Sequence, residues 1–140
     1  MKVYLKIIFF TFLVASFYEK VFASEKSLLD DSELNQIVSL VLNHQRILAY
    51  LHPEVPGRVP VVIALTNPYS FRPIKLKMFG KPIIMATNRS QLGTAVKLKI
   101  ECSVQICNVG IRYDPEGMFG NLSLSKRDNN WSVKNVEIFE

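Results

Sequence analysis

The chain has 140 residues, of which 49% are hydrophobic and 21% are charged, and its formal net charge is +5. That length is enough for one domain with one hydrophobic core. Lysine and arginine are spread along the chain without a cluster of five or more. A nucleic-acid-binding surface needs a basic stripe with stacking aromatic side chains, so we expect no nucleic-acid partner.

Residues 1–23 have the pattern of a secretory signal peptide. Lysines near the N-terminus precede an apolar run at 7–17, and Val21 and Ala23 take the small-residue positions of a cleavage site. The alternative, an uncleaved membrane anchor, needs about 20 apolar residues, and charged residues interrupt this run too early. We predict export to the periplasm or the extracellular space, with no membrane span left after cleavage.

Cleavage after residue 23 leaves a single domain, residues 24–140. The segment that is removed carries three lysines and one glutamate, so the formal charge falls from +5 to +3. A charge this small does not by itself select a strongly charged partner.

Residues 32–51 predict one continuous amphipathic helix. Asp31 or Ser32 can cap its N-terminus, because the first backbone N–H groups of a helix need a side-chain acceptor. Pro53 and Pro56 end it. The apolar residues recur at helical spacing: Leu34, Ile37, Val38, Val41, Leu42, Leu48 and Ala49.

The middle of the chain, residues 53–82, holds six of the seven prolines. One strand is predicted at 59–65, and Pro60 favours a sheet edge or the start of that strand because proline cannot donate to a ladder. Two further short strands are predicted at 74–79 and 81–87, joined by a glycine.

From Ala95 onward the chain predicts a three-stranded antiparallel meander, followed by a last strand that contains Trp131. Polar and apolar residues alternate so cleanly that pairing Cys102 with Cys107 makes every inward pair apolar, whereas a slip of one residue pairs apolar with polar. One pair speaks against this register, since Lys97 faces Arg112.

The last strand changes phase. Val133 and Val136 should both face inward, yet two residues lie between them, and strict alternation would put the two valines on opposite faces. A β-bulge near Lys134–Asn135 would insert one extra residue and restore the alternation.

Cys102 and Cys107, the two cysteines of the chain, fall opposite each other in this register. Cross-strand neighbours lie at a distance that a disulfide can span, and an exported protein meets oxidising conditions. A disulfide is the first interpretation, and two buried free thiols are the alternative. A redox couple is not favoured, because a C-x-x-x-x-C hairpin has no helix N-terminus to lower a thiol pKa as in a C-x-x-C motif. A zinc site would need two more ligands, and His44 and His52 do not have the spacing of a ligand pair.

The C-terminal segment GNLSLSKRDNNWSVKNVEIFE resembles the last hairpin of cystatin-like and NTF2-like cone-shaped domains. The resemblance rests on Gly120, Lys126, Trp131, Val133 and Glu140. It implies a helix packed on a curved antiparallel sheet. Members of that superfamily include isomerases, dehydratases and non-catalytic binding domains. The middle of this chain departs from the NTF2-like pattern, because one clear helix is predicted where that family usually has three.

Two candidate sites follow from the predicted layout. His44 and Gln45 interrupt the apolar stripe of the helix and would point toward Tyr113, where an imidazole can bind a ligand or transfer a proton. The alternative is a hydrogen-bonded core or rim histidine, because no inward carboxylate can be placed beside it.

The second candidate site is a partner-binding surface. Phe119 and Phe139 fall close together on the outer face of neighbouring strands, and exposed aromatic pairs mark interaction sites. They can instead pack under the proline-rich segment. Tyr69 and Phe71, in the loop NPYSFRP, would extend the surface.

The sequence therefore predicts an α+β fold with one N-terminal helix packed on a twisted antiparallel sheet. Its predicted function is that of a small exported, non-catalytic binding or accessory domain without a cofactor or metal, and a homodimer is one possible assembly. The alternative is a small-ligand-binding protein or a pocket enzyme of the isomerase or dehydratase type. Three N-x-S sequons, at Asn88, Asn121 and Asn130, matter if the host glycosylates exported proteins.

Overall fold

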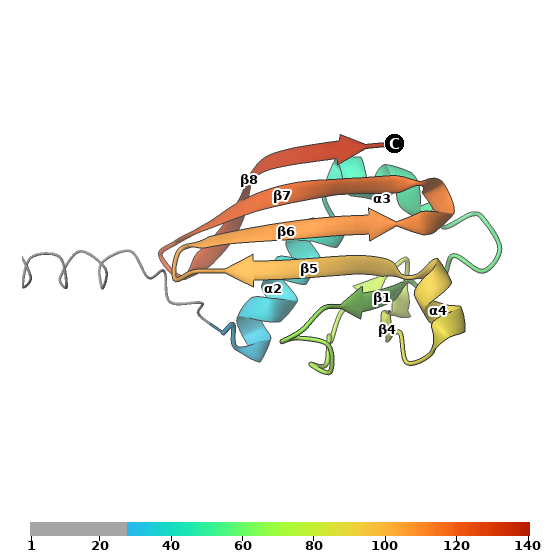
Figure 1. Ribbon diagram of the computed structural model, residues 1–140, viewed down its shortest axis with the longest axis horizontal. Coiled ribbons are helices and arrows are strands. Elements are labelled where there is room, and N and C mark those ends of the chain that lie inside the picture. The colour runs from blue at the N-terminus through green and yellow to red at the C-terminus, as the bar shows by residue number, and fades with distance from the viewer. Residues whose placement is uncertain (1–27) are drawn as a thin grey trace, which may run out of the picture.

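The computed structural model describes residues 28–140, and the predicted signal peptide, residues 1–23, lies outside them. The predicted α+β class is confirmed. One six-stranded sheet has the order β4-β1-β5-β6-β7-β8, with α2 and α3 on one face (Figure 1). Its strands are β1 Val62–Leu65, β4 Ile84–Met85, β5 Val96–Cys102, β6 Ile106–Tyr113, β7 Met118–Arg127 and β8 Asn130–Phe139.

The predicted single N-terminal helix is wrong in its continuity. The structure has α2, Asp31–Leu42, and α3, Gln45–Leu51. His44 lies between them with an extended backbone, and its Nδ1 atom accepts a hydrogen bond from the Arg46 backbone N–H at 3.3 Å. His44 is thus the N-cap of a second helix, a role that its side-chain acceptor allows.

The cap of α2 is Asp30, one residue before the two candidates that the sequence suggested. Asp30 Oδ1 accepts a hydrogen bond from the Glu33 N–H at 2.8 Å, and Glu33 Oε2 accepts one from the Asp30 N–H at 3.4 Å. This reciprocal capping box satisfies two backbone donors and fixes where the helix begins.

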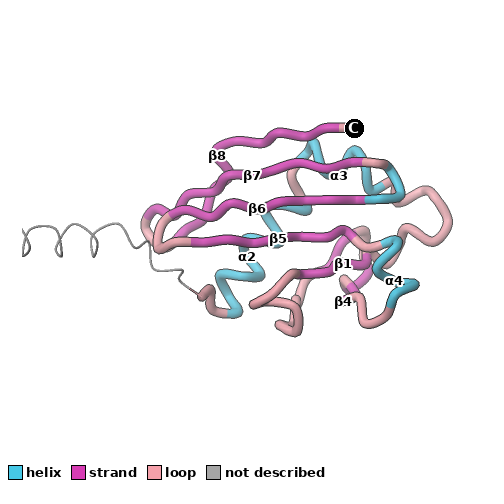
Figure 2. Tube along the Cα trace, in the orientation of Figure 1, coloured by secondary structure: helices cyan, strands magenta, loops and turns pink. Residues whose placement is uncertain are grey.

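The sheet is mixed, which corrects the prediction of a purely antiparallel sheet. β1 pairs in parallel with both β4 and β5, whereas β5 to β8 form an antiparallel meander of four strands. Figure 2 shows these four long strands side by side, with turns only at their ends. Pro60 precedes β1, which lies inside the sheet, so its position before the strand explains why it is tolerated.

The predicted register of the meander is confirmed. Cys102 pairs with Cys107, and all inward pairs of this hairpin are apolar. The bulge is also confirmed, because Ser123 pairs with Asn135 while Leu124 pairs with Val133, leaving Lys134 as the extra residue. The bulge brings the rest of β8 back into phase with the core.

The proline-rich segment contributes a small hairpin and a short helix. β2, Lys77–Met78, and β3, Lys81–Pro82, form the hairpin at the predicted glycine, and β4 follows at once. α4, Arg89–Thr94, was not predicted. A one-turn 3-10 helix, η1 Asp114–Glu116, occupies the turn between β6 and β7.

One hydrophobic core lies between the helices and the inner face of the sheet. Within residues 28–140 every buried side chain is apolar or aromatic, and no charged residue is buried. Core residues with no exposed surface come from α2, α3 and the sheet: Leu34, Ile37, Val38, Val41, Leu42, Ile47, Ile63, Leu98, Cys107, Val109, Met118 and Leu122. Side chains without exposed surface are typical of a close-packed core.

Candidate functional site

The face of β5 to β8 that points away from α2 and α3 is not covered by any helix or loop of residues 28–140 (Figure 1). We call it the outer face. Because strand side chains alternate between faces, its residues form cross-strand rows. The first row is Phe139, Phe119, Arg112 and Lys97; the second is Glu137, Asn121, Gly110 and Lys99; the third is Asn135, Ser123, Asn108 and Glu101.

The aromatic pair Phe119 and Phe139 lies at one end of the outer face. The two residues are paired across β7 and β8, their ring centroids lie 5.4 Å apart and the ring planes meet at 26°. Phe119 is 51% exposed and Phe139 is 48% exposed. Two stacked rings that stay half in water form an apolar patch that a partner can bury.

Neighbouring residues hold the aromatic pair in place. Gly120 is a residue of β7 that pairs with Ile138 of β8, and a Cβ atom on it would lie 2.2 Å from the Glu137 backbone oxygen. Its lack of a side chain therefore lets β8 approach β7 closely. The bulge at Lys134 sets the phase that turns Phe139 outward. The alternative in which the pair packs under the proline-rich segment does not agree with the exposure of both rings, 51% and 48%.

A small ion cluster borders the aromatic pair and resolves the like-charge pair that spoke against the register. Asp114 in η1 lies between Lys97 and Arg112: its Oδ2 accepts from Lys97 Nζ at 2.5 Å, and its Oδ1 accepts from Arg112 Nε. The hydrogen bond from Lys97, and then that from Arg112, lowers the pKa of Asp114 below its usual value. The cations thus share one carboxylate rather than repelling each other.

The second and third rows of the outer face are polar, and a further row beyond them holds Ile106, which is 55% exposed, beside Ser125 and Ser132. Ser123 Oγ donates to Asn108 Oδ1 at 3.2 Å, and Asn135 Nδ2 donates to Glu137 Oε1 at 3.1 Å. Asn121, one of the sequon asparagines, is exposed in the middle row. A face with polar groups beside an aromatic patch has the composition of a non-obligate protein interface.

The open edge of β8 is partly blocked. Arg46 from α3 donates to the Val136 backbone oxygen at 2.8 Å, and Lys134 occupies the bulge. Bulges and lysines on an edge strand discourage the addition of another strand. The β8 edge is therefore less open to an added strand than the outer face is to a partner.

A small pocket described within residues 28–140 is lined by Tyr113, but neither His44 nor Gln45 lines it. His44 is half-buried as the cap of α3 and Gln45 is exposed, because the helix breaks before them. Tyr113 is buried in the core, and its hydroxyl accepts a hydrogen bond from Arg58 Nη1 at 2.7 Å. Arg58 also donates to Glu116 Oε1 at 2.6 Å. A ligand site formed by His44, Gln45 and Tyr113 remains a prediction.

An open groove of about 500 Å³ lies where α3, η1 and the end of β8 meet, and sequence analysis missed it. Tyr50 donates its hydroxyl hydrogen to Glu140 Oε1 at 2.6 Å, and this bond raises the pKa of Tyr50. The groove residues come from three distant parts of the sequence, so no local pattern could reveal them: Arg46, Ala49, Tyr50, His52, Glu116 and Glu140. Its charged groups already have partners: Arg46 donates to the Val136 backbone oxygen, and Glu116 pairs with Arg58, which lies outside the groove lining.

Tyr69 and Phe71 do not extend the aromatic patch. Tyr69 is only 3% exposed, and its hydroxyl accepts a hydrogen bond from the Leu29 N–H at 3.2 Å. Phe71 is 97% exposed. It follows β1, and β5 and β6 separate that strand from β7, so it belongs to a different part of the surface from Phe119.

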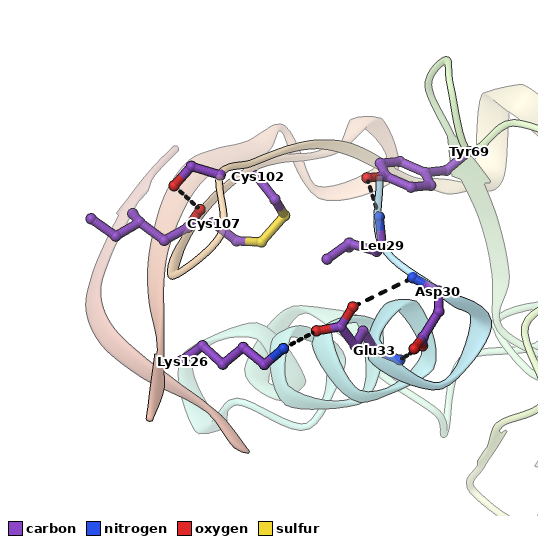
Figure 3. Close-up of a disulfide and its surroundings, with 9 residues drawn as sticks. Leu29, Asp30, Glu33, Tyr69, Cys102, Cys107 and Lys126 are labelled. Carbon is purple, nitrogen blue, oxygen red and sulfur yellow. Dashed lines mark hydrogen bonds and ion pairs between the residues drawn. A yellow bond between two sulfur atoms is a disulfide. The ribbon is translucent and has the colours of Figure 1, made fainter. Parts of the chain in front are cut away.

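The predicted Cys102–Cys107 disulfide is present at the far end of the meander, with a Cα–Cα distance of 4.1 Å. Figure 3 shows it beside Leu29 and opposite the start of α2, where Lys126 forms an ion pair with Glu33 at 2.5 Å. Both cysteines are buried. The bond thus staples the hairpin at the end where the N-terminal segment meets the sheet, which is a structural role.

No group of His, Cys, Asp and Glu side chains within residues 28–140 is arranged to hold a metal ion. None of the helices in that part of the chain has the length and apolar character that a bilayer crossing requires. Comparisons with protein-family models, with curated proteins and with solved structures gave no match to this chain.

Proposed function

We propose that this protein is a small exported binding or accessory domain that performs no catalysis and contacts a protein partner through its outer face. The observation that carries the proposal is the half-exposed Phe119–Phe139 pair on a sheet face that no described element covers. A partner that covers the two half-exposed rings removes apolar surface from water, and such burial favours association by about 25 cal/mol per Å² before the costs of association are subtracted.

The architecture around the face supports a binding role. The four-stranded meander is held by a disulfide at one end and by the Asp114 ion cluster at the other. A rigid sheet keeps the interface residues in position before a partner arrives, which lowers the entropy lost on binding. The disulfide also accords with an oxidising, exported location.

The alternative, a small-ligand pocket or an isomerase-like site, has less support. Such a site needs an apolar cavity with a few converging polar groups, whereas the interior between sheet and helices is filled by core side chains. Helices on one face of an antiparallel meander accord with the resemblance to cone-shaped domains. That superfamily includes binding domains without catalysis, so the resemblance is compatible with the proposed function.

The proposal is tested by removing the aromatic pair in the native host. A tagged, exported chain is treated with a reversible chemical cross-linker and recovered as wild type, as the double variant Phe119→Ser/Phe139→Ser, and as Phe71→Ser. Phe71 is the matched control, because it is the same residue type and more exposed. We expect wild type and the control to recover the same partner and the double variant to lose it. Equal recovery by all three folded chains would refute the proposal.

A further inference from the structure

Charge is graded across the middle row of the outer face. Glu137 on β8, Asn121 on β7, Gly110 on β6 and Lys99 on β5 stand side by side. The row is acidic at one end, uncharged in the middle and basic at the other end. Lys99 makes only an exposed contact with Glu101, at 3.2 Å, and such surface pairs contribute little.

Gly110, in the centre of that row, is not required by the fold. Its backbone has no positive φ angle, and its pairing with β5 and β7 is uninterrupted. A Cβ atom there would meet Asn121 Oδ1 and Lys99 Cβ at 3.6 Å, which is ordinary contact. Glycine weakens a strand interior and often marks a place where another chain approaches closely.

We propose that the partner of the outer face is a second copy of this chain, packed face to face about a twofold axis that runs along the strands between β6 and β7. The inference rests on the proposed function and names its partner. The axis places Glu137 of each copy opposite Lys99 of the other. It also places the Asn121 side chain of each copy opposite Gly110 of the other, which has no side chain. The dimer therefore forms the same ion pair twice, as an isologous interface requires.

The same axis gives the aromatic row a complementary neighbour. Phe119 of one copy faces Arg112 of the other, and a guanidinium above an aromatic ring is attracted to it. Phe139 faces Lys97, whose charge is already shared with Asp114. The aromatic patch of each copy thus covers the ion cluster of the other.

The charges select this axis over the other twofold axis through the same row. An axis that runs across the strands would place Lys99 against Lys99 and Glu137 against Glu137, and like charges brought together oppose association. The axis along the strands opposes no like charges in any of the three rows. Lysine and glutamate are long enough to absorb the angle of about 30° between packed sheets.

The size of the face predicts a weak dimer. Four strands at about 4.8 Å spacing and about eight residues at 3.4 Å each cover about 500 Å² per copy. The total of about 1,000 Å² is at the lower limit of specific interfaces. We therefore expect a dissociation constant in the micromolar range that rises with salt, because the two ion pairs lie at the rim.

The test uses charge reversal and mixing of the mature chain. Lys99→Glu and Glu137→Lys are each expected to raise the dissociation constant at least about tenfold, because each places two like-charged pairs in the homodimer. An equimolar mixture of the two variants is expected to restore association, since the mixed dimer has both ion pairs with opposite charges. Lys75→Glu, at an exposed site in the loop after β1, is the control and should dimerise like wild type.

Sedimentation equilibrium over a wide concentration range measures each species. A wild type that remains monomeric at all concentrations, single variants that dimerise like wild type, or a mixture that does not associate would each overturn the second-copy inference. Association of the mixture also shows that both variants are folded. A monomeric wild type that still recovers a different partner in the cross-linking experiment would refute the inference and leave the proposed function standing.

Discussion

Two strand glycines offer a direct test of how the aromatic pair is positioned. A Cβ atom at Gly120 would lie 2.2 Å from the Glu137 backbone oxygen and 3.1 Å from the Ile138 Cα atom. Backbone atoms cannot move aside as a flexible side chain can, so Gly120→Ala must push β8 away from β7. At Gly110 the nearest atoms are 3.6 Å away, and an alanine fits without any movement.

The two substitutions are therefore expected to have opposite effects on stability. Gly120→Ala overpacks a backbone contact and should lower the free energy of unfolding by about 3 kcal/mol, with a fall in Tm of about 10 °C for a domain of this size. Gly110→Ala restricts the unfolded chain and should raise the free energy of unfolding by about 0.5 kcal/mol.

Urea unfolding followed by Trp131 fluorescence measures both effects. Trp131 is the single tryptophan and is buried in β8, so its emission reports on the strand that moves. Dilute protein keeps the measurement on the monomer. If Gly120→Ala were as stable as wild type, or if Gly110→Ala were the more damaging change, the close approach of β8 to β7 would be refuted.

Three further stability predictions concern the groups that hold the ends of the sheet. Reducing the Cys102–Cys107 bond, which closes a short loop, should lower the free energy of unfolding by about 2 kcal/mol in matched urea titrations with and without reductant. The pKa of Asp114 is lower in the folded chain than in the unfolded chain. The ionised Asp114 carboxylate therefore stabilises the fold above its unfolded pKa of about 4, and this contribution is lost as pH falls through the folded pKa. In thermal melts, Asp114→Asn should make Tm fall less steeply with decreasing pH in this acid range. An unchanged dependence of Tm on pH would contradict the ion cluster. Glu33→Gln keeps a residue type that suits the capping box but removes the charge that faces Lys126. It should lower the free energy of unfolding by about 1 kcal/mol at low salt and by less at high salt, and a salt-independent loss would show that the ion pair contributes nothing.

The meander could be predicted residue by residue because two independent signals agree there. Strict alternation fixes which side chains face the core, and the Cys102–Cys107 pair fixes the register. The phase change between Val133 and Val136 then required one extra residue, and the structure places it at Lys134. The outward position of Phe139 followed from that bulge alone.

The helix break could not be read from the apolar pattern, because the stripe continues through both helices. α2 buries Val41 and Leu42, and α3 buries Ile47 after only a short interruption. Histidine was interpreted as a polar residue on an apolar face, yet its Nδ1 atom serves as a cap acceptor. The extended backbone at His44 depends on that single local hydrogen bond and on tertiary packing.

α4 was missed because it buries no side chain and so has no apolar periodicity. A local signal was present: Asn88 Oδ1 accepts from the Gln91 N–H at 2.9 Å, while Gln91 Oε1 accepts from the Thr87 N–H at 2.8 Å. An N-x-x-Q pattern of this kind predicts a helix start. Interpreting Asn88 only as part of a sequon concealed it.

The parallel pairing of β1 with β4 and β5 could not be predicted from the sequence pattern. Parallel strands need a crossover connection, and the residues between β1 and β5 contain the β2–β3 hairpin and α4 rather than one long helix. The buried position of Tyr69 has the same origin. Its hydroxyl reaches the Leu29 backbone, 40 residues earlier, and no local pattern predicts such a contact.

The outer face as a partner-binding surface is tested most directly by site-specific photo-cross-linking in the native host. A photoreactive phenylalanine derivative replaces Phe119 in one chain and Phe71 in another, and the mass of each adduct is measured after export. The account predicts an adduct from position 119 and none from position 71, and the second-copy inference further predicts that this adduct has twice the mass of the mature chain. An adduct from position 71 alone, or from neither position, would contradict it.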